Sequence, residues 1–223
     1  MKTDITVVLD RSGSMESIAR DIVKGVNEFV LGQQGVAGEA WFTLVQFDDA
    51  YDVVHFRAPI ADVPRLTRRT YVPRGSTALL DAIGRTIVDL STRIAKMTPA
   101  ERPDQIVFVV ATDGQENASH EFTRRQIFQM IRSREEAGTR HGSDADRTMP
   151  TWEFVFLAAN QDAIAEGGQM GFAAAKSVDF DADGGGVHAA MSLVHDKIAS
   201  KRGDAAATMD FNSSERSRAS RTH

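Results

Sequence analysis

Two carboxylates and three hydroxyls occur in the sequence with types and spacing that suit metal chemistry. In "TDITVVLDRSGSMES" an apolar run ends at Asp10, and Ser12 and Ser14 follow at alternate positions. Thr77 begins a helix-like segment in "GSTALLDAI", and Asp113 follows a second apolar run in "QIVFVVATDG". All five side chains offer oxygen ligands, which hard divalent cations such as Mg²⁺ or Mn²⁺ prefer. If the neutral hydroxyls bind the ion directly, it stays electrophilic and seeks an anionic oxygen from another molecule.

Each of these fragments also has a simpler interpretation when it is taken alone. Asp-Arg-Ser-Gly-Ser and Asp-Gly are turn sequences, and Gly-Ser-Thr is a helix cap. Their occurrence together, each next to a strand-like or helix-like segment, favours the metal site over three unrelated turns.

The elements that must position these residues alternate along the chain between strand-like and helix-like patterns. Alternation of this kind predicts an α/β fold, a three-layer doubly wound (Rossmann-like) mostly parallel sheet with one antiparallel edge strand and helices on both faces. The carboxyl ends of parallel strands then share one edge, where the polar segments meet. Strand patterns occupy 5–9, 40–47, 51–56, 105–114, 152–159 and 174–180, and helix patterns occupy 18–30, 77–94, 123–137 and 187–200.

Composition restricts the class of protein. The net charge of −5 argues against a nucleic-acid partner, and the absence of cysteine excludes disulfides, thiolate metal sites and a cysteine nucleophile. The chain shows no apolar stretch of about 20 residues and no basic leader, so we expect no membrane partner and a cytoplasmic location. Nothing in the sequence indicates the oligomeric state.

The three polar segments resemble the von Willebrand factor A domain family. "DRSGS" is similar to its Asp-x-Ser-x-Ser motif, and Thr77 and Asp113 follow in the family's order and contexts. The resemblance implies a metal-ion-dependent adhesion site in which Ser12 and Ser14 bind the metal directly and Thr77 does so directly or through water. Asp10 and Asp113 would act mainly through bound waters. A glutamate or aspartate of a partner protein would complete the octahedron.

The resemblance covers about residues 3–200. It predicts one von Willebrand factor A domain at 1–200, followed by a tail at 201–223 that we expect to be disordered because it lacks periodicity. Bacterial intracellular members of the family often work with AAA+ ATPases, which suggests such a complex as the partner. No catalytic residues and no organic cofactor are expected.

Several neighbouring segments have more than one interpretation. Asp48 and Asp49 are expected in a hairpin turn, with a place at the rim of the metal site as the alternative. Asp81 either orients the site through a hydrogen bond or is a solvated first-turn acid. The segment 115–117 either shapes the partner surface or begins a helix. The glycines 184–186 are expected to be a flexible lead-in to the last helix, and 138–150 an exposed loop.

The favoured function is a metal-dependent protein-binding module that is not an enzyme. The first alternative is a Mg²⁺-dependent phosphohydrolase or nuclease that uses the same acidic crevice. Serine at position 12 argues against it, since haloacid-dehalogenase-like phosphatases have Asp-x-Asp after the first strand. The second alternative is a scaffold with a vestigial metal site.

Overall fold

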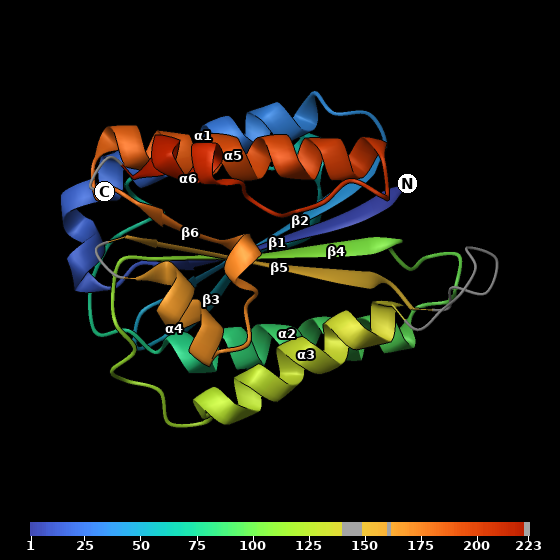
Figure 1. Cartoon of the computed structure of the whole chain (residues 1–223), viewed down its shortest axis with the longest axis horizontal. Coiled ribbons are helices and arrows are strands. Elements are labelled where there is room, and N and C mark those ends of the chain that lie inside the picture. The colour runs from blue at the N-terminus through green and yellow to red at the C-terminus, as the bar shows by residue number, and fades with distance from the viewer. Residues whose placement is uncertain (140–148, 160–161, 221–223) are drawn as a thin grey trace.

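A computed structural model of the chain describes residues 1–139, 149–159 and 162–220. In that part of the chain six strands form one sheet in the order β3-β2-β1-β4-β5-β6 (Figure 1). Neighbouring strands are parallel except β2 and β3, which form the antiparallel hairpin. The predicted fold class is therefore confirmed. The strands are β1 (Lys2–Asp10), β2 (Glu39–Phe47), β3 (Tyr51–Pro59), β4 (Gln105–Thr112), β5 (Thr151–Ala159) and β6 (Ser177–Phe180).

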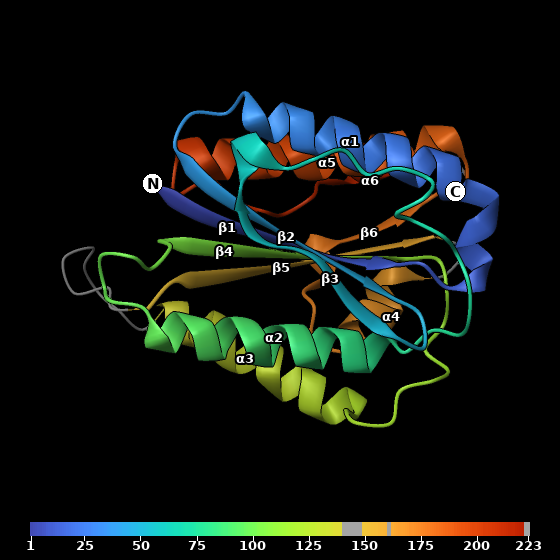
Figure 2. The same ribbon diagram turned by 180° about the vertical axis from the view of Figure 1, so that it is seen from behind.

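Helices cover both faces of the sheet (Figures 1 and 2). One layer consists of α1 (Ala19–Gln34), α5 (Gly184–Gly203) and α6 (Ser213–Ala219), and the other of α2 (Leu79–Lys96), α3 (Arg124–Thr139) and α4 (Ala163–Gln169). Short 3₁₀ turns lie at η1 (Gly13–Ile18), η2 (Ile60–Asp62) and η4 (Ala174–Lys176). Every residue of β4 is buried, as expected for a central strand with helices on both sides.

Alternation along β1 divides the core into two halves. Val7 and Leu9 face the layer of α1 and α5, whereas Val8 faces the layer of α2. β1 pairs with β4 in parallel up to Leu9 opposite Ala111, so both strands end at the same edge of the sheet. This register brings the segment after Asp10 next to the segment after Thr112.

The tail differs from its prediction, because residues 201–220 are ordered. α5 continues to Gly203, and Met209 and Phe211 in the following coil are buried. α6 begins with a capping box between Asn212 and Glu215. Periodicity failed to reveal this packing because two of the buried apolar side chains lie in irregular backbone. The tail's last residues, 221–223, lie outside the described chain.

Two further loop predictions have different outcomes. Gly184–Gly186 form the first turn of α5, and the Asp183 side chain accepts a hydrogen bond from the Gly186 amide, so they are not a flexible lead-in. Most of the expected loop 138–150 lies outside the described residues, which omit 140–148. Among the helices described, none combines the length and the apolar character needed to span a bilayer.

Candidate metal centre

Two hydroxyls from the loop after β1 and a carboxylate from the loop after β4 lie together at the carboxyl edge of the sheet. The oxygens Ser12 Oγ and Ser14 Oγ are 3.1 Å apart. Ser14 Oγ donates a hydrogen bond of 2.6 Å to Asp113 Oδ1, although the two residues are 99 positions apart in the chain. The parallel pairing of β1 and β4 accounts for this contact, since both loops leave the same edge of the sheet.

The Thr77 hydroxyl lies with the two serine hydroxyls, and the position of Gly114 shows that there is a space between the three. A Cβ atom built on Gly114 would lie 2.8 Å from Thr77 Oγ1 and 3.4 Å from both Ser12 Oγ and Ser14 Oγ. Three hydroxyls therefore surround one position, which any side chain at 114 would fill. A cradle of three hydroxyl oxygens with Asp113 at its side fits a hard divalent cation.

Asp10 lies beneath this cradle and is fully buried. Its Oδ1 accepts a hydrogen bond of 2.6 Å from the Ser12 amide, and its Oδ2 accepts one of 2.5 Å from Thr112 Oγ1. Burial raises the pKa of the Asp10 carboxyl to about 6, and the hydrogen bonds from Thr112 and Ser12 lower it only in part. Burial likewise raises the pKa of Asp113. A divalent cation would stabilise both carboxylates in their charged form.

Asp48 has a larger role than a hairpin-turn residue. It is fully buried, and its Oδ2 accepts hydrogen bonds of 2.9 Å from Arg11 Nε and 2.8 Å from Arg74 Nε. Burial alone would raise the pKa of Asp48, but hydrogen bonds from the Ala50 amide and from both arginines outweigh it, so that the pKa is lowered. Asp48 therefore connects the loop after β1 to the segment that leads to Thr77.

The loop after Asp113 is fastened to the start of α2. Asn117 Oδ1 accepts a hydrogen bond of 2.9 Å from the Thr77 amide, and Glu116 Oε2 accepts one of 2.9 Å from the Leu80 amide. The Asp81 carboxylate accepts three hydrogen bonds from the amides of residues 120–122. Asp81 and residues 116–117 thus hold this loop in place, and none of the three is a solvated helix-turn acid or a free surface residue.

All five predicted site residues are therefore brought to one place, whereas Asp49 and Asp81 make no hydrogen bond with them. In the described chain, no group of three His, Cys, Asp or Glu side chains is arranged to hold a metal ion, so a centre here depends on the hydroxyls. Sequence reasoning missed Thr112 and Tyr71, and it gave Asn117 a place at the partner surface or in a helix turn but not its hydrogen bond with the Thr77 amide. Thr112 had a usable signal, because it is the last strand residue before Asp113.

Solved structures with the same arrangement of strands and helices decide the fold. A von Willebrand factor type A protein from Catenulispora acidiphila is 13% identical over 88% of this chain and 42% of its own, with a TM-score of 0.55. The VWA2 paralogue of ArnB from Sulfolobus acidocaldarius is 13% identical over 89% of this chain and 44% of its own, with a TM-score of 0.51. The chain has the von Willebrand factor A fold.

A third structure of this fold contains a metal. Proximal thread matrix protein 1 from the mussel byssus, with a zinc-occupied metal-ion-dependent adhesion site, is 15% identical over 91% of this chain and 44% of its own, with a TM-score of 0.52. The present chain spans less than half the length of each of these three proteins. No protein-family model and no curated protein matches the sequence.

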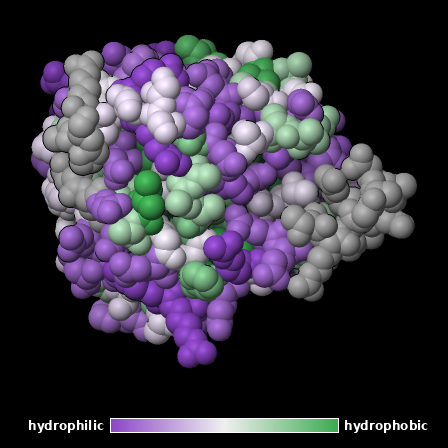
Figure 3. All heavy atoms as spheres, in the orientation of Figure 1, coloured by the Kyte–Doolittle hydropathy of each residue, from purple (hydrophilic) through white to green (hydrophobic). Residues whose placement is uncertain are grey.

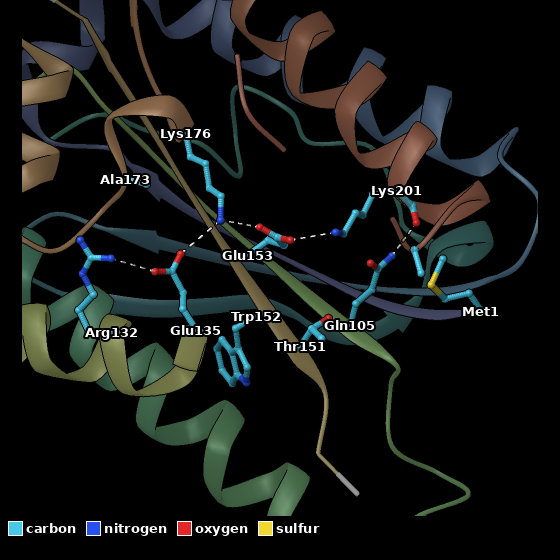
Figure 4. A pocket seen from close by; sticks show the side chains of 11 residues that line it. Met1, Gln105, Arg132, Glu135, Thr151, Trp152, Glu153, Ala173, Lys176 and Lys201 are labelled. Atoms are coloured by element: carbon cyan, nitrogen blue, oxygen red, sulfur yellow. Dashed lines mark hydrogen bonds and ion pairs between the residues drawn. The ribbon is translucent and has the colours of Figure 1, made fainter. Parts of the chain in front are cut away.

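A cleft of about 510 Å³ lies at the opposite, amino edge of this von Willebrand factor A fold (Figure 4). Glu153 occupies its centre, with its two oxygens 2.7 Å from Lys176 Nζ and 2.9 Å from Lys201 Nζ. Burial would raise the pKa of Glu153, but the two lysines outweigh it and the pKa is lowered. The ion pairs join β5 to η4 and α5, so the cleft is a structural junction remote from the hydroxyl cradle.

Proposed function

We propose that the chain is a metal-dependent protein-binding module and not an enzyme. Ser12, Ser14 and Thr77 would hold a divalent cation, Mg²⁺ or Mn²⁺, directly, and Asp10 and Asp113 would hold it through waters. The observation that carries the proposal is the convergence of three hydroxyls on the space over Gly114, beside Asp113. The cation would supply Lewis acidity toward a glutamate or aspartate of a partner.

The burial and hydrogen bonds of the site residues suit the binding of a partner carboxylate to the cation. Asp10 orients the Ser12 amide and the Thr112 hydroxyl, and it lies too deep for a partner to reach. Ser14 is exposed and Asp113 is half-buried, so the cradle opens to solvent on that side. The two carboxylates balance the charge of a divalent ion, while the hydroxyls leave it able to attract an outside anion.

The two alternatives have less support. A hydrolase needs a group that activates water or a nucleophile, and in the described residues no histidine forms a hydrogen bond with any of the five site residues. A scaffold that acts through apolar contacts needs an apolar surface, and the face in Figure 3 is mainly hydrophilic with small, separate apolar groups. A cytoplasmic location and an AAA+ ATPase complex as partner are also part of the proposal, and the family resemblance is the support for the AAA+ ATPase complex.

The direct test is calorimetry of the chelator-treated protein with Mg²⁺ and with Mn²⁺. We expect one ion per chain for the unmodified protein and none for Asp113→Ala. Asp49→Ala is the matched control, because Asp49 is an exposed acid near the site that makes no hydrogen bond with the five residues. Equal binding by the unmodified protein and Asp113→Ala would contradict the proposal.

A further inference from the structure

A basic loop precedes Thr77 in a chain whose overall charge is negative. Residues 63–77 contain four arginines and no acidic residue, whereas the whole chain has a net charge of −5. All four arginines are exposed, and the apolar Val72 is 51% exposed among them. We call residues 63–77 the arginine loop; its arginines are Arg65, Arg68, Arg69 and Arg74.

The arginine loop borders the hydroxyl cradle directly. The Arg74 amide donates a hydrogen bond of 2.8 Å to the Arg11 carbonyl, and the Gly13 amide donates one of 3.2 Å to the Gly75 carbonyl. Arg68 Nη2 lies 3.4 Å from Glu16 Oε1, and Glu16 is only two residues beyond Ser14. By chain length, the Arg68 guanidinium therefore lies within about 15 Å of the Ser14 backbone.

The backbone of the arginine loop is held in one conformation. Asn27 of α1 donates to the Leu66 carbonyl and accepts from the Leu66 amide, at 2.9 and 2.8 Å. Thr67 and Thr70 close a turn through hydrogen bonds between their own backbone and hydroxyl groups. Arg68 and Arg69 project from this turn, so little backbone entropy is lost when they bind a partner.

Three of the four arginines are available to a partner. Arg74 is engaged by the buried carboxylate of Asp48. Arg68 meets Glu16 in a pair that is more than half exposed on both sides and is therefore weak. The guanidinium groups of Arg65 and Arg69 form no hydrogen bond or ion pair with any residue that the structure describes. Guanidinium groups bind carboxylates in a bidentate fork, which suits acidic side chains.

We propose that the arginine loop binds additional carboxylates of the same partner, so that the module selects an acidic segment and not an isolated glutamate or aspartate. This proposal rests on the metal-dependent capture proposed above. One carboxylate would reach the cradle while others, about four or five residues away in an extended peptide, meet Arg68 and Arg69. Arg65 lies on the same loop and would extend the contact.

The test uses two labelled peptides and fluorescence anisotropy in Mg²⁺. One peptide contains a single glutamate in a glycine–serine sequence, and the other has the same length with several further glutamates on both sides. We expect the acidic peptide to bind the unmodified protein roughly five- to tenfold more tightly, as two exposed ion pairs would contribute. Arg68→Gln/Arg69→Gln should lose this gain and keep the binding of the single-glutamate peptide.

A charge-matched control separates local recognition from net charge. Lys96→Gln/Arg125→Gln removes two exposed positive charges from α2 and α3, on the other face of the sheet, and should keep the gain. An equal gain in unmodified protein and Arg68→Gln/Arg69→Gln, no gain at all, or tighter binding of a single-stranded DNA of equal charge would overturn this inference alone. Loss of Mg²⁺-dependent binding for both peptides would overturn the proposed function, and this inference with it.

Discussion

Tyr71 donates a hydrogen bond of 2.7 Å from its phenolic oxygen to the main-chain carbonyl oxygen of Asp10. Tyr71 is 1% exposed, and burial raises its pKa, so the phenol keeps its proton. The bond joins the arginine loop, which leads to Thr77, to the last residue of β1. The two sequence segments that supply the hydroxyls are thereby fixed relative to each other.

Tyr71→Phe should lower the free energy of unfolding by about 1 kcal/mol, because it leaves the buried Asp10 carbonyl without this donor. It should also weaken Mg²⁺ binding several-fold. Urea unfolding and calorimetry measure the two effects. Tyr51→Phe is the control, since Tyr51 loses a hydrogen bond to Thr86 outside the cradle. Equal Mg²⁺ affinity in the two variants would show that Tyr71 has no part in positioning the site.

Gly114→Ala should abolish metal binding or weaken it at least tenfold while the metal-free protein stays folded. The added methyl group would lie 2.8 Å from Thr77 Oγ1, inside the space between the hydroxyls. Gly168→Ala in α4 makes the same chemical change where no atom lies within 4 Å. It should keep the metal affinity and stabilise the helix by up to about 1 kcal/mol. If calorimetry gave Gly114→Ala the same metal affinity as the unmodified protein, the cradle would be ruled out as the metal centre.

The stability of the metal-free protein should depend on pH through Asp10. Its folded pKa, about 6, exceeds the ordinary value of 3.8, so the folded state binds the proton more tightly than the unfolded state. The resulting stabilisation is complete below the ordinary pKa and is lost as the pH rises through about 6. In chelator the melting temperature should therefore be higher near pH 5 than near pH 7.5.

A cation competes with that proton, so the gain in melting temperature from Mg²⁺ should increase between these two pH values. Asp10→Asn should remove the gain in melting temperature that Mg²⁺ gives. In chelator it should also remove part of the pH dependence of the melting temperature. The rest belongs to Asp4, whose pKa burial also raises to about 6 despite its ion pair with Arg57, and to Asp113, whose pKa burial raises as well. If the gain in melting temperature from Mg²⁺ did not change with pH, this assignment to Asp10 would be contradicted.

Phe211→Ala should destabilise the protein by about 3 kcal/mol, as truncation of a buried aromatic side chain does. Phe211 is 4% exposed, and its amide donates a hydrogen bond of 2.7 Å to the Ala175 carbonyl, which anchors the tail beside β6. Thermal and urea unfolding measure the loss, with the exposed neighbour Asp210→Ala as control. A melting temperature equal to that of the control would restore the expectation of a disordered tail.

Asp81→Asn should reduce both stability and metal affinity. The Asp81 carboxylate accepts three amide hydrogen bonds from residues 120–122, and these outweigh burial so that its pKa is lowered. An asparagine has only one acceptor oxygen, so at least one amide loses its partner, at a cost of about 1–3 kcal/mol. Asp89→Asn, an exposed change on the same helix, should have neither effect. Full Mg²⁺ affinity in Asp81→Asn would show that the loop needs no such support.

The fold and the meeting of the five site residues were accessible from the sequence because both follow from local patterns. Apolar runs reveal buried strands, and parallel strands bring the residues after Leu9 and Ala111 to one edge. The supporting contacts were not accessible. In the sequence Asp48 looks like an ordinary acid of a hairpin turn, and its hydrogen bonds with Arg11 and Arg74 exist only in the folded structure. Long-range ion pairs of this kind have no periodicity that a sequence displays.

The tail shows a second reason why some features could not be predicted from the sequence. Met209 and Phe211 are buried in coil, where neither helical nor strand spacing applies. Their burial depends on the surface that α5 and β6 offer, so a local pattern contains no information about it. Gly114 belongs to the same class, because its small size matters only once Thr77 lies against it.

The outer strands of the sheet also determine how a partner can be recognised. In the described residues, β6 is only four residues long, and the Asp181 amide just beyond it already donates to the Ala219 carbonyl. β3 at the other edge has register shifts opposite Phe42–Val45 and a φ of 41° at Arg57. Neither edge offers a long, regular row of free backbone groups, so we expect no partner to bind by adding a strand to this sheet. Recognition then depends on side chains and a bound ion, which single substitutions can switch off without any change to the backbone.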